Sequence, residues 1–143
     1  MPHKLSILVS TLALVGSFAG IPASAQSQSP LPQEQMQGSI AYLSGGIGLD
    51  ESAAIKKAAP NYPLELEFVR TAVPRAEYLS DVKVTIKDHT GKTVLDTVSA
   101  GPFLLAKLPA GSFTVLAQHA DVGKQRVVNI KARGHERVMF VWQ

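Results

Sequence analysis

Hydrophobic and polar residues alternate along much of the chain, in runs short enough to be β-strands. Residues 64–68 read Leu-Glu-Leu-Glu-Phe, which places three apolar side chains on one face and two glutamates on the other. A strand with one face in the core and the other toward water shows this period of two. The pattern therefore predicts a half-buried strand at residues 64–68.

The same period recurs at intervals of about ten residues, as in all-β domains. Residues 82–86 and 93–98 flank Asp-His-Thr-Gly at 88–91, whose residue types favour a turn, so we predict a β-hairpin there. Further short strands are predicted at 40–43, 103–108, 113–117, 128–130 and 138–142. We expect a mostly β fold, an antiparallel transthyretin-like or immunoglobulin-like β-sandwich of about 7–8 strands with one short N-terminal helix.

A glycine-rich segment at residues 42–51, Tyr-Leu-Ser-Gly-Gly-Ile-Gly-Leu-Asp-Glu, precedes the predicted helix. Its spacing matches neither the Walker loop nor the dinucleotide fingerprint. Asp50 and Glu51 also lie where a phosphate would bind at a helix start, and like charges repel. We predict a structural turn, with Asp50 as the N-cap of a helix at 51–59 that Pro60 ends.

The N-terminus carries the pattern of an export signal. Lys4 precedes an uncharged apolar stretch, and Ala-Ser-Ala at 23–25 ends it. We predict a signal peptide at residues 1–25, cleaved between Ala25 and Gln26, and a periplasmic or secreted protein with no stable membrane insertion after signal removal. Residues 26–38, rich in glutamine and proline, predict a flexible leader. The β-sandwich domain is expected at 39–143.

Composition narrows the class of partner. Without residues 1–25 the chain keeps 13 Lys and Arg against 11 Asp and Glu, and its basic residues are scattered. A scattered net charge of +2 offers no stripe for a phosphate backbone, so we expect no nucleic acid partner. The chain has no cysteine, so its hydrophobic core must stabilise it without disulfides.

Three segments from residue 81 onward resemble the carboxypeptidase regulatory-like domain. They are Asp-Val-Lys-Val-Thr-Ile at 81–86, Ser-Ala-Gly-Pro-Phe-Leu-Leu at 99–105, and Leu-Pro-Ala-Gly-Ser-Phe-Thr-Val at 108–115. In the last segment Phe113 stands where the family usually has tyrosine. The resemblance implies a transthyretin-like β-sandwich in a small secreted bacterial protein. It implies no peptidase activity, because catalysis in that family belongs to a separate zinc-binding domain.

Motifs for catalysis are missing from the sequence. His89, His119 and His135 are far apart and none has a neighbour at the spacing of a zinc motif. No Gly-x-Ser-x-Gly elbow and no cysteine nucleophile is present. We therefore predict no catalytic residue, no metal ligand and no cofactor.

The longest connection between predicted strands, residues 70–80, is the best candidate for a contact surface. It carries Arg70, Arg75 and Tyr78, residue types enriched at binding hot spots. The alternative is that Tyr78 and Leu79 only close one end of the sandwich.

These observations predict an exported, non-enzymatic β-sandwich module for binding or structural interaction with an unknown protein or cell-envelope component. Two other classes stay open. One is a small hydrolase or metal-dependent periplasmic enzyme. The other is a carbohydrate-binding module, whose exposed aromatic side chains would come from Tyr42, Tyr62, Tyr78 and Trp142.

Overall fold

The computed structural model describes residue 20 and residues 30–143, and within them the chain forms a β-sandwich with one helix outside it. The first part contains β1 (Gln35–Gln37), β2 (Ile40–Gly45), α1 (Leu49–Ala58), a 3-10 turn (Ala59–Asn61), β3 (Leu64–Arg70) and β4 (Glu77–Tyr78). The second part contains β5 (Lys83–Asp88), β6 (Thr93–Val98), β7 (Phe103–Ala106), β8 (Gly111–His119), β9 (Val122–Ile130) and β10 (Glu136–Trp142).

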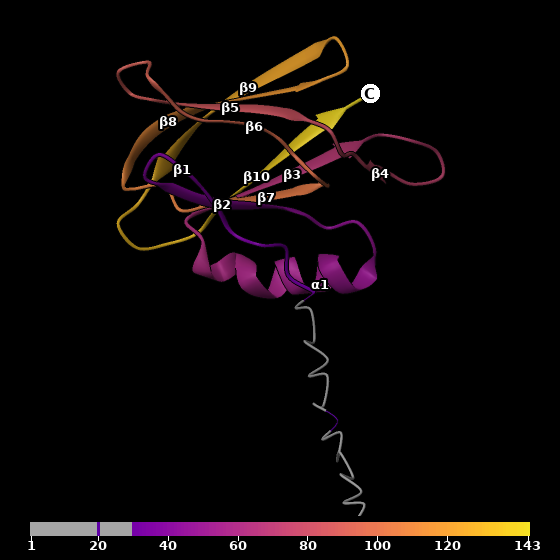
Figure 1. The fold of residues 1–143 in the computed structure, drawn as a ribbon. Helices are drawn as coiled ribbons and strands as arrows, with labels where there is room; N and C mark the ends of the chain where they lie inside the picture. Colours follow the sequence, from indigo (N-terminus) through magenta and orange to yellow (C-terminus); the bar gives the residue numbers. More distant parts are fainter. Residues whose placement is uncertain (1–19, 21–29) are drawn as a thin grey trace, which may run out of the picture.

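The strands form two sheets. In the described chain, sheet A has the order β1-β2-β7-β3-β10, with β4 also pairing with β3, and sheet B has the order β6-β5-β8-β9. Figure 1 shows α1 across the face of sheet A that is opposite sheet B, so the molecule has three layers. The mostly β sandwich with one short helix is confirmed.

Two clusters of buried residues hold these layers together. The larger lies between the sheets and includes Phe68, Phe140 and Trp142. The smaller lies between α1 and sheet A; its members are Leu43, Ile55, Ala59, Tyr62, Phe103 and Leu105. Burial of apolar area at roughly 25 cal/mol per Å² is the main favourable contribution to folding in a domain without disulfides.

Strand β3 differs from its prediction in burial. It is central in sheet A, and β10 pairs with it in parallel over its whole length. Glu65 and Glu67, expected to face water, are only 6% and 3% exposed. A parallel neighbour from the end of the chain cannot be read from the local alternation, so the half-buried strand and the all-antiparallel pairing are corrected here.

The hairpin prediction is confirmed, since β5 and β6 pair antiparallel around residues 88–91. Asp88 accepts hydrogen bonds from the backbone N–H groups of Thr90 and Lys92 and from the Thr90 hydroxyl. The hydrogen bond from the Thr90 hydroxyl, together with the two hydrogen bonds from backbone N–H groups, holds the pKa of Asp88 below its usual value. The turn residues are therefore held by the side chain that opens the turn.

The glycine segment makes a turn, but its cap differs from the prediction. The helix begins at Leu49 with Gly48 in the N-cap position and no side-chain cap, so Asp50 as N-cap is wrong. Glu51 instead accepts a 2.7 Å hydrogen bond from the backbone N–H of Gly46. The Glu51 carboxylate thus accepts a hydrogen bond from a backbone N–H group that a bound phosphate would otherwise use. Gly46 and Gly48 both have positive φ, which glycine adopts without strain.

Part of the predicted flexible leader is ordered. Strand β1 pairs antiparallel with β2, and Gln37 exchanges hydrogen bonds with the backbone of Asp96 in sheet B. Glu34 also accepts a hydrogen bond from Tyr62. These are contacts of polar groups, so a composition poor in apolar residues did not reveal them. The prediction of a flexible leader is wrong for residues 30–38.

The predicted signal peptide and the cleavage point between Ala25 and Gln26 lie outside the residues that are described, apart from Gly20. No helix within the described residues is long and apolar enough to cross a membrane.

Candidate functional site

The outer face of sheet A, the one turned away from sheet B, is divided into two halves. Over β2 and β7 the side chains are apolar and α1 covers them. Over β3 and β10 the side chains belong to Glu65, Glu67, Val69, Arg137, Met139 and Val141, with Tyr78 beside Val69 and His135 just before β10. We call this second group, Tyr78 and His135 included, the β3–β10 face.

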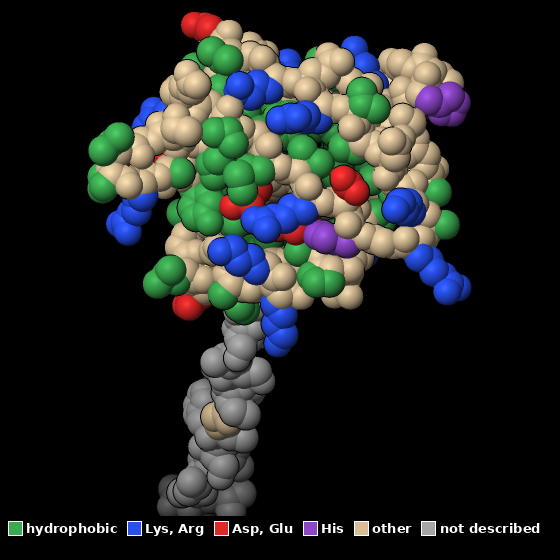
Figure 2. Space-filling model, turned by 180° about the vertical axis from the view of Figure 1, so that it is seen from behind, with side chains coloured by type: hydrophobic (Ala, Val, Ile, Leu, Met, Phe, Trp, Pro, Cys, Tyr) green, Lys and Arg blue, Asp and Glu red, His purple; other side chains and the backbone are tan. Residues whose placement is uncertain are grey.

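The strand register brings these side chains together in rows. Leu105, Glu65 and Arg137 form one row, Phe103, Glu67 and Met139 the next, and Tyr78, Val69 and Val141 the third. Directly opposed residues on neighbouring strands have side chains close enough to interact. The face is therefore charged at one end and apolar at the other. Figure 2 shows acidic, basic and histidine side chains gathered on this side of the molecule, with hydrophobic side chains next to them.

Two ion pairs satisfy the buried glutamates. Arg137 Nη2 contacts Glu67 Oε2, and Arg137 Nε lies 3.9 Å from Glu65 Oε1. The hydrogen bond and charge of Glu67 raise the pKa of Arg137 above its usual value. The Arg137 side chain is 54% exposed, so the guanidinium covers the carboxylates and still faces solvent.

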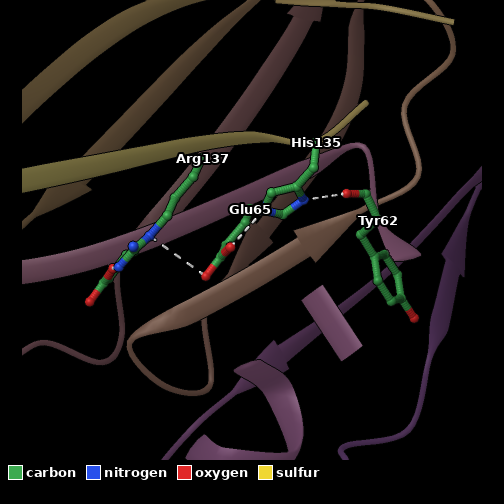
Figure 3. Close-up of polar contacts among 5 residues, drawn as sticks. Tyr62, Glu65, His135 and Arg137 are labelled. Carbon is green, nitrogen blue, oxygen red and sulfur yellow. Dashed lines mark hydrogen bonds and ion pairs between the residues drawn. The ribbon is translucent and has the colours of Figure 1, made fainter. Parts of the chain in front are cut away.

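His135 is held by two oxygen acceptors (Figure 3). Its Nδ1 lies 2.7 Å from the Tyr62 carbonyl oxygen and its Nε2 lies 2.8 Å from Glu65 Oε2. A carbonyl can only accept, so Nδ1 carries a proton. A proton must also lie between Nε2 and the carboxylate, because two facing lone pairs at this distance would repel. Neither ring nitrogen is then free to act as a base toward a substrate or to bind a metal.

Tyr62 links this face to the covered half. Its ring belongs to the cluster under α1, and its hydroxyl donates to Glu34, which also pairs with Lys107 at 2.9 Å. Burial, and then the bond to Glu34, raises the pKa of Tyr62 to about 12. The same Tyr62 hydrogen bond, followed by that of Lys107, lowers the pKa of Glu34.

The predicted contact loop lies at one edge of this face. Arg70 pairs with Glu77 at 2.5 Å across β3 and β4, and Arg75 is exposed in the connection between them. Tyr78 is 54% exposed, and its ring centroid lies 5.6 Å from that of Phe103. Leu79 is buried in the main core, so it closes the sandwich while Tyr78 does not. The structure thus places Tyr78 on the β3–β10 face and the loop beside it.

His89 lies in the turn between β5 and β6, His119 ends β8 and His135 precedes β10. Among the described residues, no group of three or more His, Cys, Asp and Glu side chains is placed to hold a metal ion. His119 packs edge-on against Trp142, with ring centroids 6.0 Å apart.

Sequence reasoning missed the contact between His135 and Glu65. They are 70 residues apart, but a signal was present. Glu65 and Glu67 occupy alternate positions in one strand, as His135 and Arg137 do near another, and opposite charges at matching spacing favour neighbouring strands.

Comparisons with known proteins leave the family open. No known protein family and no curated protein matches this sequence. A structure titled "The Bacillus anthracis TIE protein" matches with a TM-score of 0.43 at 22% identity. The match covers 55% of this chain and 16% of that chain.

Proposed function

We propose that this chain is an exported, non-enzymatic module that binds a protein or cell-envelope partner through the β3–β10 face. The observation that carries the proposal is the exposure of Tyr78, Met139 and Val141 at 54%, 43% and 39% on a sheet surface that α1 leaves open. Tyrosine, methionine and arginine are enriched at protein interfaces. Export is the part of the proposal that rests on the sequence of residues 1–25 alone.

Two neighbours extend this surface. Arg137 presents a half-exposed guanidinium beside the apolar row, and Val73 in the loop between β3 and β4 is 99% exposed. An aromatic and aliphatic centre with an arginine at its margin is a usual arrangement for a protein contact. Arg75, exposed in the loop between β3 and β4, is assigned to the rim of the proposed surface, whereas Arg70 at the end of β3 pairs with Glu77 on the other face of the sheet.

The resemblance to the carboxypeptidase regulatory-like domain supports a non-catalytic role, and membership of that family is part of this proposal. Phe113 is buried two residues after Gly111, whose φ is +149°, which is consistent with a turn that returns the aromatic side chain to the core. The fold alone does not assign a function.

The two alternatives have less support. A hydrolase would be built on the pair of Glu65 and His135, but both nitrogens of that histidine already face oxygen atoms of the protein. A carbohydrate-binding module needs exposed aromatic rings on one face, whereas Tyr42, Tyr62 and Trp142 are at most 7% exposed.

Photo-crosslinking in the cell of origin tests the proposal. A benzophenone amino acid at Tyr78 or Met139 should yield a discrete adduct with one partner, which mass spectrometry identifies. The matched control is Val127, which is 63% exposed on β9 of sheet B. The same adduct at equal yield from position 127, or no adduct from 78 and 139 in a folded protein, would refute the proposed surface.

A further inference from the structure

Strand β10 lies at the edge of sheet A, and its hydrogen bonds to β3 fix which backbone groups remain free. At one end the Glu136 N–H donates to the Pro63 carbonyl, and at the other the Thr71 N–H donates to the Trp142 carbonyl, each at 2.8 Å. Both residues of β10 in these bonds have even numbers. In a parallel ladder alternate residues of one strand direct both backbone groups to the neighbour, so Glu136, Val138, Phe140 and Trp142 bond to β3.

The odd-numbered residues therefore direct their backbone groups away from β3. Arg137, Met139 and Val141 have their N–H and C=O groups on the open edge, and no other described strand pairs with β10. Such a row of unpaired donors and acceptors is a template for another strand.

This edge lacks the features that protect the other described edges. Strand β1 is only three residues long, the pairing of β6 with β5 is interrupted by an irregularity, and β9 carries Lys124 and Arg126 at positions that face inward. Short strands, bulges and inward-facing charges all discourage pairing. Strand β10 has seven residues, no proline and two exposed apolar side chains, Met139 and Val141.

We propose that β10 pairs antiparallel with β10 of a second copy of this chain, with Met139 opposite Met139 on the two-fold axis. In this register Arg137 lies opposite Val141 of the other copy. The free backbone groups then meet as hydrogen-bonded pairs, each exchanging both of its N–H···O bonds. A two-fold interface requires such a self-complementary surface.

Charge complementarity favours a second copy over another partner strand. The same register sets Glu136 of one copy opposite Trp142 of the other. Lys124 lies over that tryptophan, with its Nζ 5.9 Å from the ring centroid. Glu136 is exposed, so its carboxylate is free to approach Lys124 of the second copy. The two-fold axis repeats this opposite-charge contact at both ends of the strand pair.

This inference goes beyond the proposed partner surface and does not depend on it. Pairing uses the backbone edge of β10, whereas the β3–β10 face presents side chains. The dimer would place two such faces side by side on one continuous sheet.

Sedimentation analysis of the protein expressed from the full sequence, over a concentration series, tests the pairing. We expect a dimer that dissociates on dilution. Met139→Pro removes the backbone N–H group of residue 139, which faces the open edge. Proline is tolerated at such positions of edge strands, so the fold should be kept while dimerisation weakens by about 10-fold or more. Met139→Ala keeps the donor and serves as the control, with a change below about three-fold.

A charge exchange tests the register. Glu136→Lys and Lys124→Glu should each weaken the dimer about 10-fold, and the double variant should return to within about three-fold of the wild type. Circular dichroism confirms that each variant is folded. A monomer at every concentration would overturn the proposal. So would a dimer that Met139→Pro leaves unchanged, or one that the double variant does not restore.

Discussion

On the outer face of sheet A, strands β2 and β7 lie beneath helix α1, whereas β3 and β10 have no helix over them. In the covered half, Leu43, Phe103 and Leu105 are fully buried against the helix. In the open half, Glu65 and Glu67 are almost as deeply buried, but Arg137 and His135 cover them. One sheet surface is therefore shielded from water in two ways, by an apolar helix and by paired charges.

The apolar helix and the paired charges differ in what they contribute to the stability of the fold. Burial of apolar side chains stabilises a fold directly, while a buried ion pair gives back in Coulomb energy about what it loses in desolvation. The charged half is thus a weak source of stability, and it leaves Arg137, Met139 and Tyr78 at the surface. We infer that α1 holds the fold and that the open half is available for contact.

The largest loss of stability is expected from a substitution in the covered half. Ile55 is the residue of α1 that is fully buried against sheet A, so Ile55→Ala should lower the free energy of unfolding by about 2–5 kcal/mol through lost burial and the cavity left behind. Leu49 lies in the same helix but is 89% exposed, and Leu49→Ala should change it by less than about 0.5 kcal/mol. Urea denaturation measures both, and equal losses would contradict the role given to the helix.

A smaller loss of stability is expected when an ion pair of the open half is broken. Arg137→Ala leaves the buried Glu67 carboxylate without its cation, which should cost about 1–3 kcal/mol in the same denaturation assay. Arg133→Ala, in the loop before β10, is the control and should cost less than about 0.5 kcal/mol. A loss no larger than that of the control would mean that the Glu67 carboxylate does not depend on the Arg137 guanidinium.

Tyr62 connects the covered half of the sheet surface to the open half, and the raised pKa of its hydroxyl makes its contribution to stability depend on pH. The folded pKa of about 12 lies above the usual value of 10.0, so its stabilising effect is complete below pH 10 and is lost as pH rises toward 12. Tyr62→Phe lacks the hydroxyl and should cost about 1 kcal/mol at pH 8. Denaturation of both proteins from pH 8 to 12 should show this difference shrinking. A constant difference would exclude the bond between Tyr62 and Glu34 as its source.

The smallest effect concerns how α1 begins. Asp50 makes no cap hydrogen bond, so Asp50→Ala should cost at most about 0.5 kcal/mol. Glu51→Ala removes the acceptor of the Gly46 N–H and should cost about 1 kcal/mol. Thermal melting of the two variants ranks them, and the reverse order would restore Asp50 as the cap.

Much of the fold could be predicted from local patterns. The turn residues at 88–91 and the alternation on either side gave the β5–β6 hairpin correctly, because both signals lie within a few residues of each other. The burial of Glu65 could not be predicted in this way. It depends on β10 as the parallel neighbour of β3, and the matching spacing of charged residues in the two strands is visible only when these distant segments are compared.

The candidate site was predicted only in part. Tyr78 was singled out from its residue type and its loop, and the structure places it on the open face. The sequence predicts His135 to be isolated, because its two acceptors are a backbone carbonyl and a glutamate far away in the sequence. Strand β1 was missed because backbone pairing holds it rather than an apolar pattern.

The most direct test replaces the charged pair by apolar residues of similar size, Glu67→Leu with Arg137→Met, in a protein that carries the photo-crosslinker at position 78. Removing both members of a buried pair is close to neutral for stability, so we expect the fold to be kept and the melting temperature to be nearly unchanged. Loss of the partner adduct in this folded variant is the result that the account predicts. An adduct of unchanged yield would contradict it, because the charged end of the β3–β10 face would then play no part in recognition.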